Sequence, residues 1–308
     1  MHPPAPHDRP PDRSHVLTEQ RNPRTMDLHA QSVEQLVATF AREDQAALDA
    51  VRAAGPSLSS FLAAAEPRWL AGGRLIYLGA GTSGRLGVLD ASECPPTFQT
   101  PPERVVGIIA GGDASLRKSS EGMEDDPDGA RPAIEALGLN GDDMVVGIAA
   151  GGTTPYVLGA LKLAKSLAAG QKPLTAMISC SPPSGPLPAD HLILLATGPE
   201  VITGSTRLKA GTATKLALNT ISSTLMIRSG RVHENLMVDL RASNAKLRDR
   251  AARVVSTLTG LDRHAAFELL DRAGGAAKTA VVMHRLSMDR AAAEAELART
   301  DGRIPSRP

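Results

Sequence analysis

The chain is short of aromatic residues, cysteine, net charge and long hydrophobic runs. Phenylalanine, tyrosine and tryptophan make up only 2% of its 308 residues, too few for a surface on which nucleobases stack. The 34 lysines and arginines almost balance the 33 aspartates and glutamates, so charge gives no reason to expect nucleic acid or an anionic membrane as a partner. Two cysteines cannot form a disulfide framework or a four-cysteine metal site.

The sequence also lacks a run of about 18 apolar residues, and its N-terminus has no hydrophobic signal segment. We therefore expect neither a membrane-spanning helix nor secretion. An apolar fraction of 42% is typical of a soluble globular protein. Together these features favour a cytoplasmic enzyme or sensor.

Five short apolar runs dominate the middle of the chain. Each ends in glycine or a small polar residue, and the segments between them leave room for helices. Nearly continuous apolar strands that alternate with helices are typical of a parallel sheet covered on both faces. The pattern predicts a five-stranded, doubly wound α/β sandwich of the flavodoxin type. It does not predict the order of the strands in the sheet. The runs cover residues 74–80, 104–112, 144–152, 174–180 and 191–197.

Apolar residues at helical spacing flank these runs on both sides. The expected helices cover residues 31–52, about 57–66, 211–228, about 234–257, 262–273, 276–286 and 288–299. The first residues are rich in proline and histidine and have little to bury. The predicted organisation is a disordered tail (1–16), an α/β domain with an N-terminal helical extension (17–245), a C-terminal helical subdomain (246–299) and a frayed tail (300–308).

The first apolar run leads into a loop that combines glycine with hydroxyl side chains. Its LGAGTSGRLG fits the GxGxxG pattern, but the nearest acidic residue of the kind a dinucleotide site needs is Asp113, 29 positions beyond Gly84. Hydroxyl donors at Thr82 and Ser83, with the backbone of Gly81, suit a phosphomonoester at a helix N-terminus instead. An ordinary glycine-rich turn is the alternative.

The third run repeats this device with Gly152, Thr153 and Thr154, followed by Pro155 at the expected start of a helix. Loops at the carboxyl ends of parallel strands converge on one crevice, so the two loops predict one phosphate site. Because serine and threonine are also common helix caps, two caps without a ligand remain the alternative.

A third polar segment, EVITGSTRLKAGTATK, leads into the helix expected near residue 211. Ser205 and Lys209 could close over an anionic ligand. A helix cap with solvated charges explains the segment equally well.

Two groups of carboxylates could serve acid–base chemistry. Glu93 lies in DASECPP, where two prolines disfavour helix beyond it, which predicts a carboxylate fixed at a helix end near the first loop. Glu121 and Glu124 follow the second run and share a face if that segment is helical. A solvated charged face is the alternative for this pair.

The segments LGAGTSGRLGVLDASECPP, IAGGDASLRKSSEGMEDD, VVGIAAGGTTPYV and EVITGSTRLKAGTATK together resemble the N-acetylmuramic acid 6-phosphate etherase family. The similarity extends over roughly residues 17–299. It implies a sugar isomerase (SIS) domain and a cytoplasmic homodimer in peptidoglycan recycling. The implied reaction is that of a lyase in carbohydrate metabolism, which cleaves the D-lactyl ether of a sugar phosphate to give N-acetylglucosamine 6-phosphate and D-lactate. The resemblance implies no metal and no organic cofactor.

By motif position, the catalytic glutamates of the family fall on Glu93, as the acid, and on Glu124, as the base. The predicted substrate- and phosphate-binding residues are the loop residues named above together with Ser205 and Lys209. The sequence departs from the family at Gly151, where relatives commonly carry serine, and at Thr153, where some carry arginine. A non-catalytic sugar-phosphate regulator and a sugar-phosphate isomerase are the alternatives; retained acid–base residues argue against the first.

Overall fold

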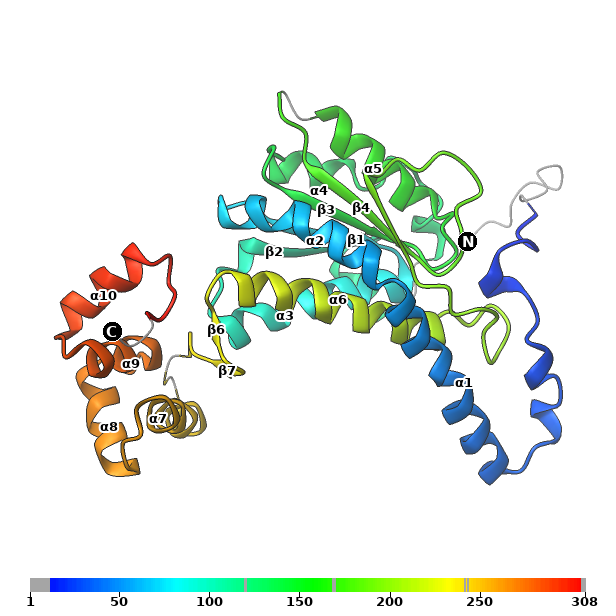
Figure 1. The fold of residues 1–308 in the computed structure, drawn as a ribbon. Helices are drawn as coiled ribbons and strands as arrows, with labels where there is room; N and C mark the ends of the chain where they lie inside the picture. Colours follow the sequence, from blue (N-terminus) through cyan, green and yellow to red (C-terminus); the bar gives the residue numbers. More distant parts are fainter. Residues whose placement is uncertain (1–11, 119–120, 168–169, 241, 243, 306–308) are drawn as a thin grey trace.

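The computed structural model describes residues 12–118, 121–167, 170–240, 242 and 244–305 (Figure 1). The five predicted strands are confirmed, and they form one parallel sheet in the order β2-β1-β3-β4-β5. This is the flavodoxin-type order, in which the chain reverses direction across the sheet between β1 and β3. The strands are β1 Leu75–Gly79, β2 Val105–Ile109, β3 Met144–Ile148, β4 Leu174–Ser179 and β5 His191–Leu194.

Helices cover both faces of the sheet, as the continuous apolar runs predict. Along β1, Leu75 and Tyr77 point into one layer, whereas Ile76 and Leu78 point into the opposite one. The first layer holds α1 Val33–Ala53, α2 Gly55–Leu70, α3 Gly81–Phe98 and α6 Lys209–Arg228. The second layer holds α4 Arg131–Leu137 and α5 Pro155–Leu167.

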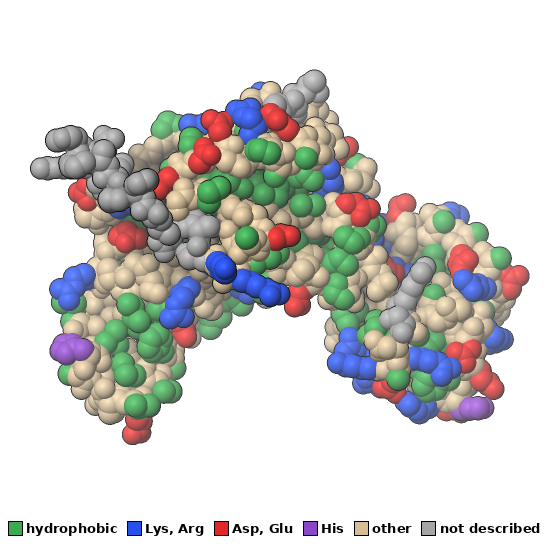
Figure 2. All heavy atoms as spheres, turned by 180° about the vertical axis from the view of Figure 1, so that it is seen from behind, with side chains coloured by type: hydrophobic (Ala, Val, Ile, Leu, Met, Phe, Trp, Pro, Cys, Tyr) green, Lys and Arg blue, Asp and Glu red, His purple; other side chains and the backbone are tan. Residues whose placement is uncertain are grey.

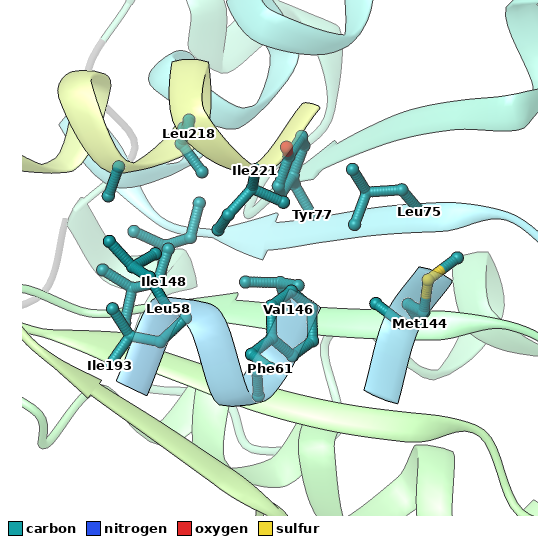
Figure 3. Close-up of a cluster of buried hydrophobic side chains, with 14 of the residues drawn as sticks. Leu58, Phe61, Leu75, Tyr77, Met144, Val146, Ile148, Ile193, Leu218 and Ile221 are labelled. Carbon is teal, nitrogen blue, oxygen red and sulfur yellow. The ribbon is translucent and has the colours of Figure 1, made fainter. Parts of the chain in front are cut away.

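The larger core lies between the sheet and α2 and α6 (Figure 3). Phe61 of α2 and Ile221 of α6 are fully buried and lie against side chains of β1 and β3, such as Tyr77 and Val146. Burial of each large apolar side chain contributes about 1.5–3 kcal/mol. This packing fixes the carboxyl ends of β1 and β3, from which the predicted ligand loops extend.

Helix α3 is longer than predicted. It continues through Pro95 and Pro96 to Phe98, so the expectation that Glu93 stands at a helix end was wrong. Phe98 packs against the core, and its carbonyl accepts a hydrogen bond from the Arg231 guanidinium at 2.7 Å. These contacts hold the last turn although the prolines provide no backbone N–H donors.

The predicted helix over 234–257 begins too early. Val232–His233 (β6) and Leu236–Met237 (β7) form an antiparallel hairpin instead, with Glu234 at a φ of 55° in its turn. The following helix, α7, spans Ala245–Thr259. Its start is set by a side-chain cap, because Asn244 accepts a hydrogen bond from the Leu247 amide at 2.9 Å.

The C-terminal helices gather around a core of their own, apart from the sheet (Figure 1). Val238 and Leu240 already pack into this core, and Ile304 packs into it from the predicted frayed tail. The division into domains stays a prediction. No helix in the described part of the chain is long and apolar enough to cross a bilayer. After α7 follow α8 Arg263–Arg272, α9 Ala277–Leu286 and α10 Arg290–Arg299.

The chain enters the fold before the end of the predicted tail. Residues 1–11 lie outside the described residues, but 12–16 are described and Val16 is only 3% exposed. Three single 3₁₀ turns, Leu17–Glu19, Pro23–Thr25 and Leu28–Ala30, then lead to α1. Ser32 begins α1 with a reciprocal capping box to Gln35.

Candidate functional site

A cleft of about 190 Å³ lies where β1 and β3 end, at the edge of the sheet where the two glycine and hydroxyl loops meet. It brings together the predicted residues Gly81, Thr82, Ser83, Thr153 and Thr154 with the predicted carboxylate Glu124. The N-terminal segment and the residues before α6 complete its walls. The lining comprises Arg13, Val16, Glu19, Ala80, Gly81, Thr82, Ser83, Glu124, Ala150, Gly151, Thr153, Thr154 and Thr206.

The first turn of α3 forms one side of the cleft. Gly81 has a φ of 52°, a conformation that glycine adopts without strain, and the helix has no side-chain N-cap. Amide groups in a first helical turn have no partners within the helix, and the helix dipole favours an anion there. With the Thr82 and Ser83 hydroxyls, this turn can bind a phosphate group.

The loop before α5 forms the opposite side. Gly152 lies just behind the lining with a φ of 75°, where a Cβ would stand 2.9 Å from the Ser179 Oγ. Its neighbour Gly151 lines the cleft, and a Cβ there would stand 3.3 Å from the Val16 Cγ1. Val16 thus takes up part of the space that a side chain at position 151 would need, which gives a physical reason for glycine at this position.

Glu124 is held beside the same loop by its backbone. Its carbonyl accepts a hydrogen bond from the Tyr156 amide, in the first turn of α5, at 3.0 Å. The preceding 3₁₀ turn covers Glu121–Met123, so Glu124 follows it and the two glutamates do not share a helical face. The side chain of Glu121 lies outside the described residues.

Glu93 lies outside the cleft. It is exposed on α3, 12 positions from Gly81, which corresponds to about 18 Å along the helix axis. A single chain therefore does not bring Glu93 and Glu124 into one cavity.

A buried carboxyl, Asp90, lies one helical turn before Glu93. It accepts hydrogen bonds from the Tyr77 hydroxyl at 3.0 Å and the Ser222 hydroxyl at 3.3 Å, and its Oδ1 is 3.8 Å from the Lys215 Nζ. Burial raises the pKa of Asp90 above its ordinary value, and the charge of Glu93 adds to the rise. The Asp90 carboxyl thus links α3 to β1 and α6 directly beneath Glu93.

Lys209 is placed in a different environment from the one predicted. Its side chain is fully buried, and its Nζ lies 3.3 Å from the Glu43 Oε2. Asn22 and Arg24 donate to the same carboxylate, at 2.8 Å and 2.7 Å. The hydrogen bond from Arg24 is the main reason why the pKa of Glu43 is lowered to about 2. We call these four residues the Glu43 cluster.

Ser205 does not line the cleft either; its carbonyl accepts a hydrogen bond from the Leu208 amide at 3.1 Å, while its neighbour Thr206 does line it. Thr206 lies in the polar segment EVITGSTRLKAGTATK that the sequence analysis singled out. The other lining residues that sequence reasoning missed are Arg13, Val16 and Glu19. They lie in or next to the stretch whose composition predicted a tail, and no local pattern distinguishes them.

The doubly wound sheet and the paired loops at its carboxyl edge define an SIS-domain protein. A family model described as the glucokinase regulatory protein N-terminal SIS domain matches residues 58–165. N-acetylmuramic acid 6-phosphate etherases from Synechococcus sp. and Gloeobacter violaceus are 51% identical over 285 residues and 49% identical over 299 residues. The matches cover 92% and 97% of this chain, and 89% and 96% of those proteins.

The chain belongs to the N-acetylmuramic acid 6-phosphate etherase family. A further relative of the same name, from Deinococcus radiodurans, is 50% identical over 88% of this chain and 88% of its own length. The predicted fold and family are confirmed, and the regulator and isomerase alternatives are not favoured. Within the described residues, no three histidine, cysteine, aspartate or glutamate side chains are grouped to hold a metal ion. That the reaction needs no metal or organic cofactor stays a prediction.

Proposed function

We propose that this chain cleaves the D-lactyl ether of N-acetylmuramic acid 6-phosphate to give N-acetylglucosamine 6-phosphate and D-lactate. The observation that carries the proposal is that Glu124 lies in the same cleft as the two glycine and hydroxyl loops. The names of its relatives, which share about half of its residues, support the same substrate. We further propose that the reaction serves peptidoglycan recycling in the cytoplasm, as the family resemblance implies.

The loops hold the phosphate and take no part in bond breaking. Hydroxyls of Thr82, Ser83, Thr153 and Thr154 donate to its oxygens, and the first turn of α3 adds backbone donors and a favourable dipole. A phosphate held at one end of the sugar positions the reacting carbons relative to Glu124. Because the substrate loses its translational and rotational freedom when it binds, this entropy is not lost again in the step that breaks the bond.

Elimination followed by hydration accounts for the need for two carboxyl groups. Opening of the sugar ring makes C1 an aldehyde, which acidifies the proton on C2. Glu124 removes that proton, the C3–O bond breaks, and a carboxylic acid gives its proton to the departing lactyl oxygen. Water then adds at C3 of the unsaturated aldehyde: the deprotonated acid takes a proton from the water, and the protonated Glu124 returns a proton to C2. Each such proton transfer contributes about 10²–10⁴-fold to the rate.

We propose that the acid is Glu93 of a second copy of the chain, so that the active unit is a homodimer. Within one chain Glu93 is exposed and lies outside the cleft. A cleft of about 190 Å³ is also smaller than the roughly 300 Å³ from which pockets that enclose a small ligand begin. The site of one chain is therefore incomplete for a phosphorylated amino sugar with a lactyl group.

The projecting lobe formed by α1 and the segment before it supports an association between copies. Figure 2 shows hydrophobic side chains gathered on this lobe. The large exposed ones in these elements are Met26, Val33, Val37 and Leu48, and Val33 is 79% exposed. Apolar groups that cluster on a surface are typical of an interface.

Release of D-lactate tests the reaction. The purified chain is incubated with N-acetylmuramic acid 6-phosphate or with unphosphorylated N-acetylmuramic acid, and D-lactate is measured by a coupled assay. We expect release from the phosphorylated substrate and far slower release from the other. No release from the phosphorylated substrate contradicts the proposed activity, and equal rates contradict the role of the loops.

Mixing two inactive variants tests the shared site. Glu93→Gln and Glu124→Gln are each expected to be inactive, but after subunit exchange half of the dimers are mixed and have one intact site. The mixture should recover about a quarter of the wild-type activity per chain. Exchange is verified with differently tagged chains. Verified exchange without recovery shows that both carboxyls come from one chain, contrary to the proposal.

A further inference from the structure

The N-terminal segment forms one wall of the cleft. Arg13, Val16 and Glu19 line it alongside the two loops. The family resemblance assigns no role to Arg13, which lies in the stretch that composition predicts to be a tail.

This wall is attached to the body of the fold at several points. Val16 is buried against Gly151, and the Thr18 carbonyl accepts a hydrogen bond from the Gly204 amide at 3.1 Å. The Thr25 hydroxyl donates to the Val201 carbonyl at 2.9 Å. These contacts fix the segment on the loop after β3 and on the residues before α6, so the position of Arg13 beside the cleft is part of the fold.

The charges around the cleft make Arg13 distinctive. Among the described residues that line it, Arg13 is the only cation, whereas Glu19 and Glu124 are carboxylates. Lys209, the cation predicted for this purpose, is paired with Glu43 in the buried Glu43 cluster. Hydroxyls and amides alone would leave a phosphate dianion facing two carboxylates without a compensating positive side chain.

We propose that Arg13 is the cation that binds the phosphate group in this cleft. The proposal rests on the proposed function in one respect, namely that the ligand is a phosphomonoester. A guanidinium can donate two parallel hydrogen bonds to phosphate oxygens, and it stays charged at any pH at which the protein is folded. Arg13 therefore determines the preference for phosphorylated over unphosphorylated sugars and takes no part in proton transfer.

Calorimetric binding of two sugars tests this assignment without reference to turnover. N-acetylglucosamine 6-phosphate and N-acetylglucosamine are titrated into the wild-type chain and into Arg13→Gln. Loss of a hydrogen bond between charged groups should weaken binding of the phosphorylated sugar about 10- to 100-fold. Binding of the unphosphorylated sugar should stay unchanged. Arg13→Lys retains the charge and should recover part of the loss.

Arg21→Gln is the matched control, because Arg21 is an exposed arginine of the same segment that does not line the cleft. It should leave both affinities unchanged. Thermal unfolding of each variant shows whether the fold is intact; Arg13 is exposed, so its substitution should not affect stability. In turnover, Arg13→Gln should raise KM for the phosphorylated substrate.

The inference fails if Arg13→Gln binds the phosphorylated sugar within about twofold of the wild type, or if both sugars lose affinity equally. It also fails if the wild-type chain shows no binding of the phosphorylated sugar. A chain that binds this sugar through Arg13 but releases no D-lactate contradicts the proposed function alone. A chain that releases D-lactate independently of Arg13 contradicts the inference alone.

Discussion

The Glu43 cluster and the cleft are both polar, and both include residues of the N-terminal segment and residues near the start of α6, yet they are organised in opposite ways. In the cluster, the Glu43 carboxylate is 2% exposed and its charge is met by Arg24 and Lys209. In the cleft, hydroxyls and Arg13 line an open volume. In the sequence, Lys209 of the cluster lies only three positions after Thr206 of the cleft. Buried charges with complete partners hold the fold, whereas polar groups around an open volume remain able to bind a ligand.

The largest effect that separates the two regions is expected at Glu124. Glu124→Gln removes the proposed base and should lower kcat about 10²–10⁴-fold. The variant should still fold, since the backbone contact to Tyr156 remains. Steady-state D-lactate release measures kcat, and urea unfolding shows whether the variant folds. Asp125→Asn, an exposed neighbour outside the lining, is the control and should keep its activity. An active Glu124→Gln enzyme would place the base elsewhere.

The opposite outcome is expected at Glu43. Glu43→Gln keeps the size of the side chain but removes the ion-pair partner of the buried Lys209. Loss of one partner of a buried ion pair costs about 3–5 kcal/mol of unfolding free energy. Urea unfolding measures it, and Asp49→Asn on the exposed side of α1 is the control. A change below about 1 kcal/mol, the range of exposed pairs, would show that the cluster does not hold the fold.

The cluster should also make the free energy of unfolding depend on pH in the acidic range. The pKa of Glu43 is lowered from 4.5 to about 2, so its contribution is present above about pH 4.5 and is lost as the pH falls towards 2. The total loss is about 3 kcal/mol. Unfolding free energies at several pH values between 6 and 2.5 measure it (roughly the window of the shift). Glu43→Gln should lack this part of the pH dependence; an identical curve for the variant would assign the acid sensitivity to other groups.

The smallest effects distinguish two adjacent glycines of the cleft loop. Gly152→Ala forces a side chain onto a φ of 75° and should cost about 1–2 kcal/mol of stability. Gly151→Ala only requires Val16 to shift and should cost less than about 1 kcal/mol, with a small rise in KM. Unfolding and kinetic assays on both variants check the order. The reverse order would show that a side chain at position 151 loses more stability against Val16 than a side chain at position 152 loses through backbone strain.

The strands and most helices could be predicted because their signals are local. The buried strand β3, Met144–Ile148, has no polar side chain, and the loops after β1 and β3 follow directly from the ends of their strands. The helix through Pro95 could not be predicted, because contacts of Phe98 with distant residues outweigh the local preference. The turn at Glu234 lacks the glycine that marks most hairpins.

The errors at the site have one physical origin. Lys209 pairs with Glu43, 166 positions away, and no local pattern reveals that its charge is already neutralised. Arg13 lies in a stretch with few apolar residues, which the buried side chain of Val16 and the hydrogen bonds of Thr18 and Thr25 fix on the fold. The loops that form the cleft were therefore found from the sequence, whereas the burial of Lys209 and the position of Arg13 beside the cleft were not.

Helix α3 carries the proposed phosphate-binding turn at Gly81 and, three turns further on, the proposed acid Glu93. In a dimer that shares its sites, this one helix would bind the phosphate in one active site through its first turn and donate the proton in the other active site through Glu93. A small tilt caused by a ligand at its first turn would move the acid in the opposite site. Occupancy of one site and turnover at the other would then be mechanically coupled, without any dedicated regulatory element.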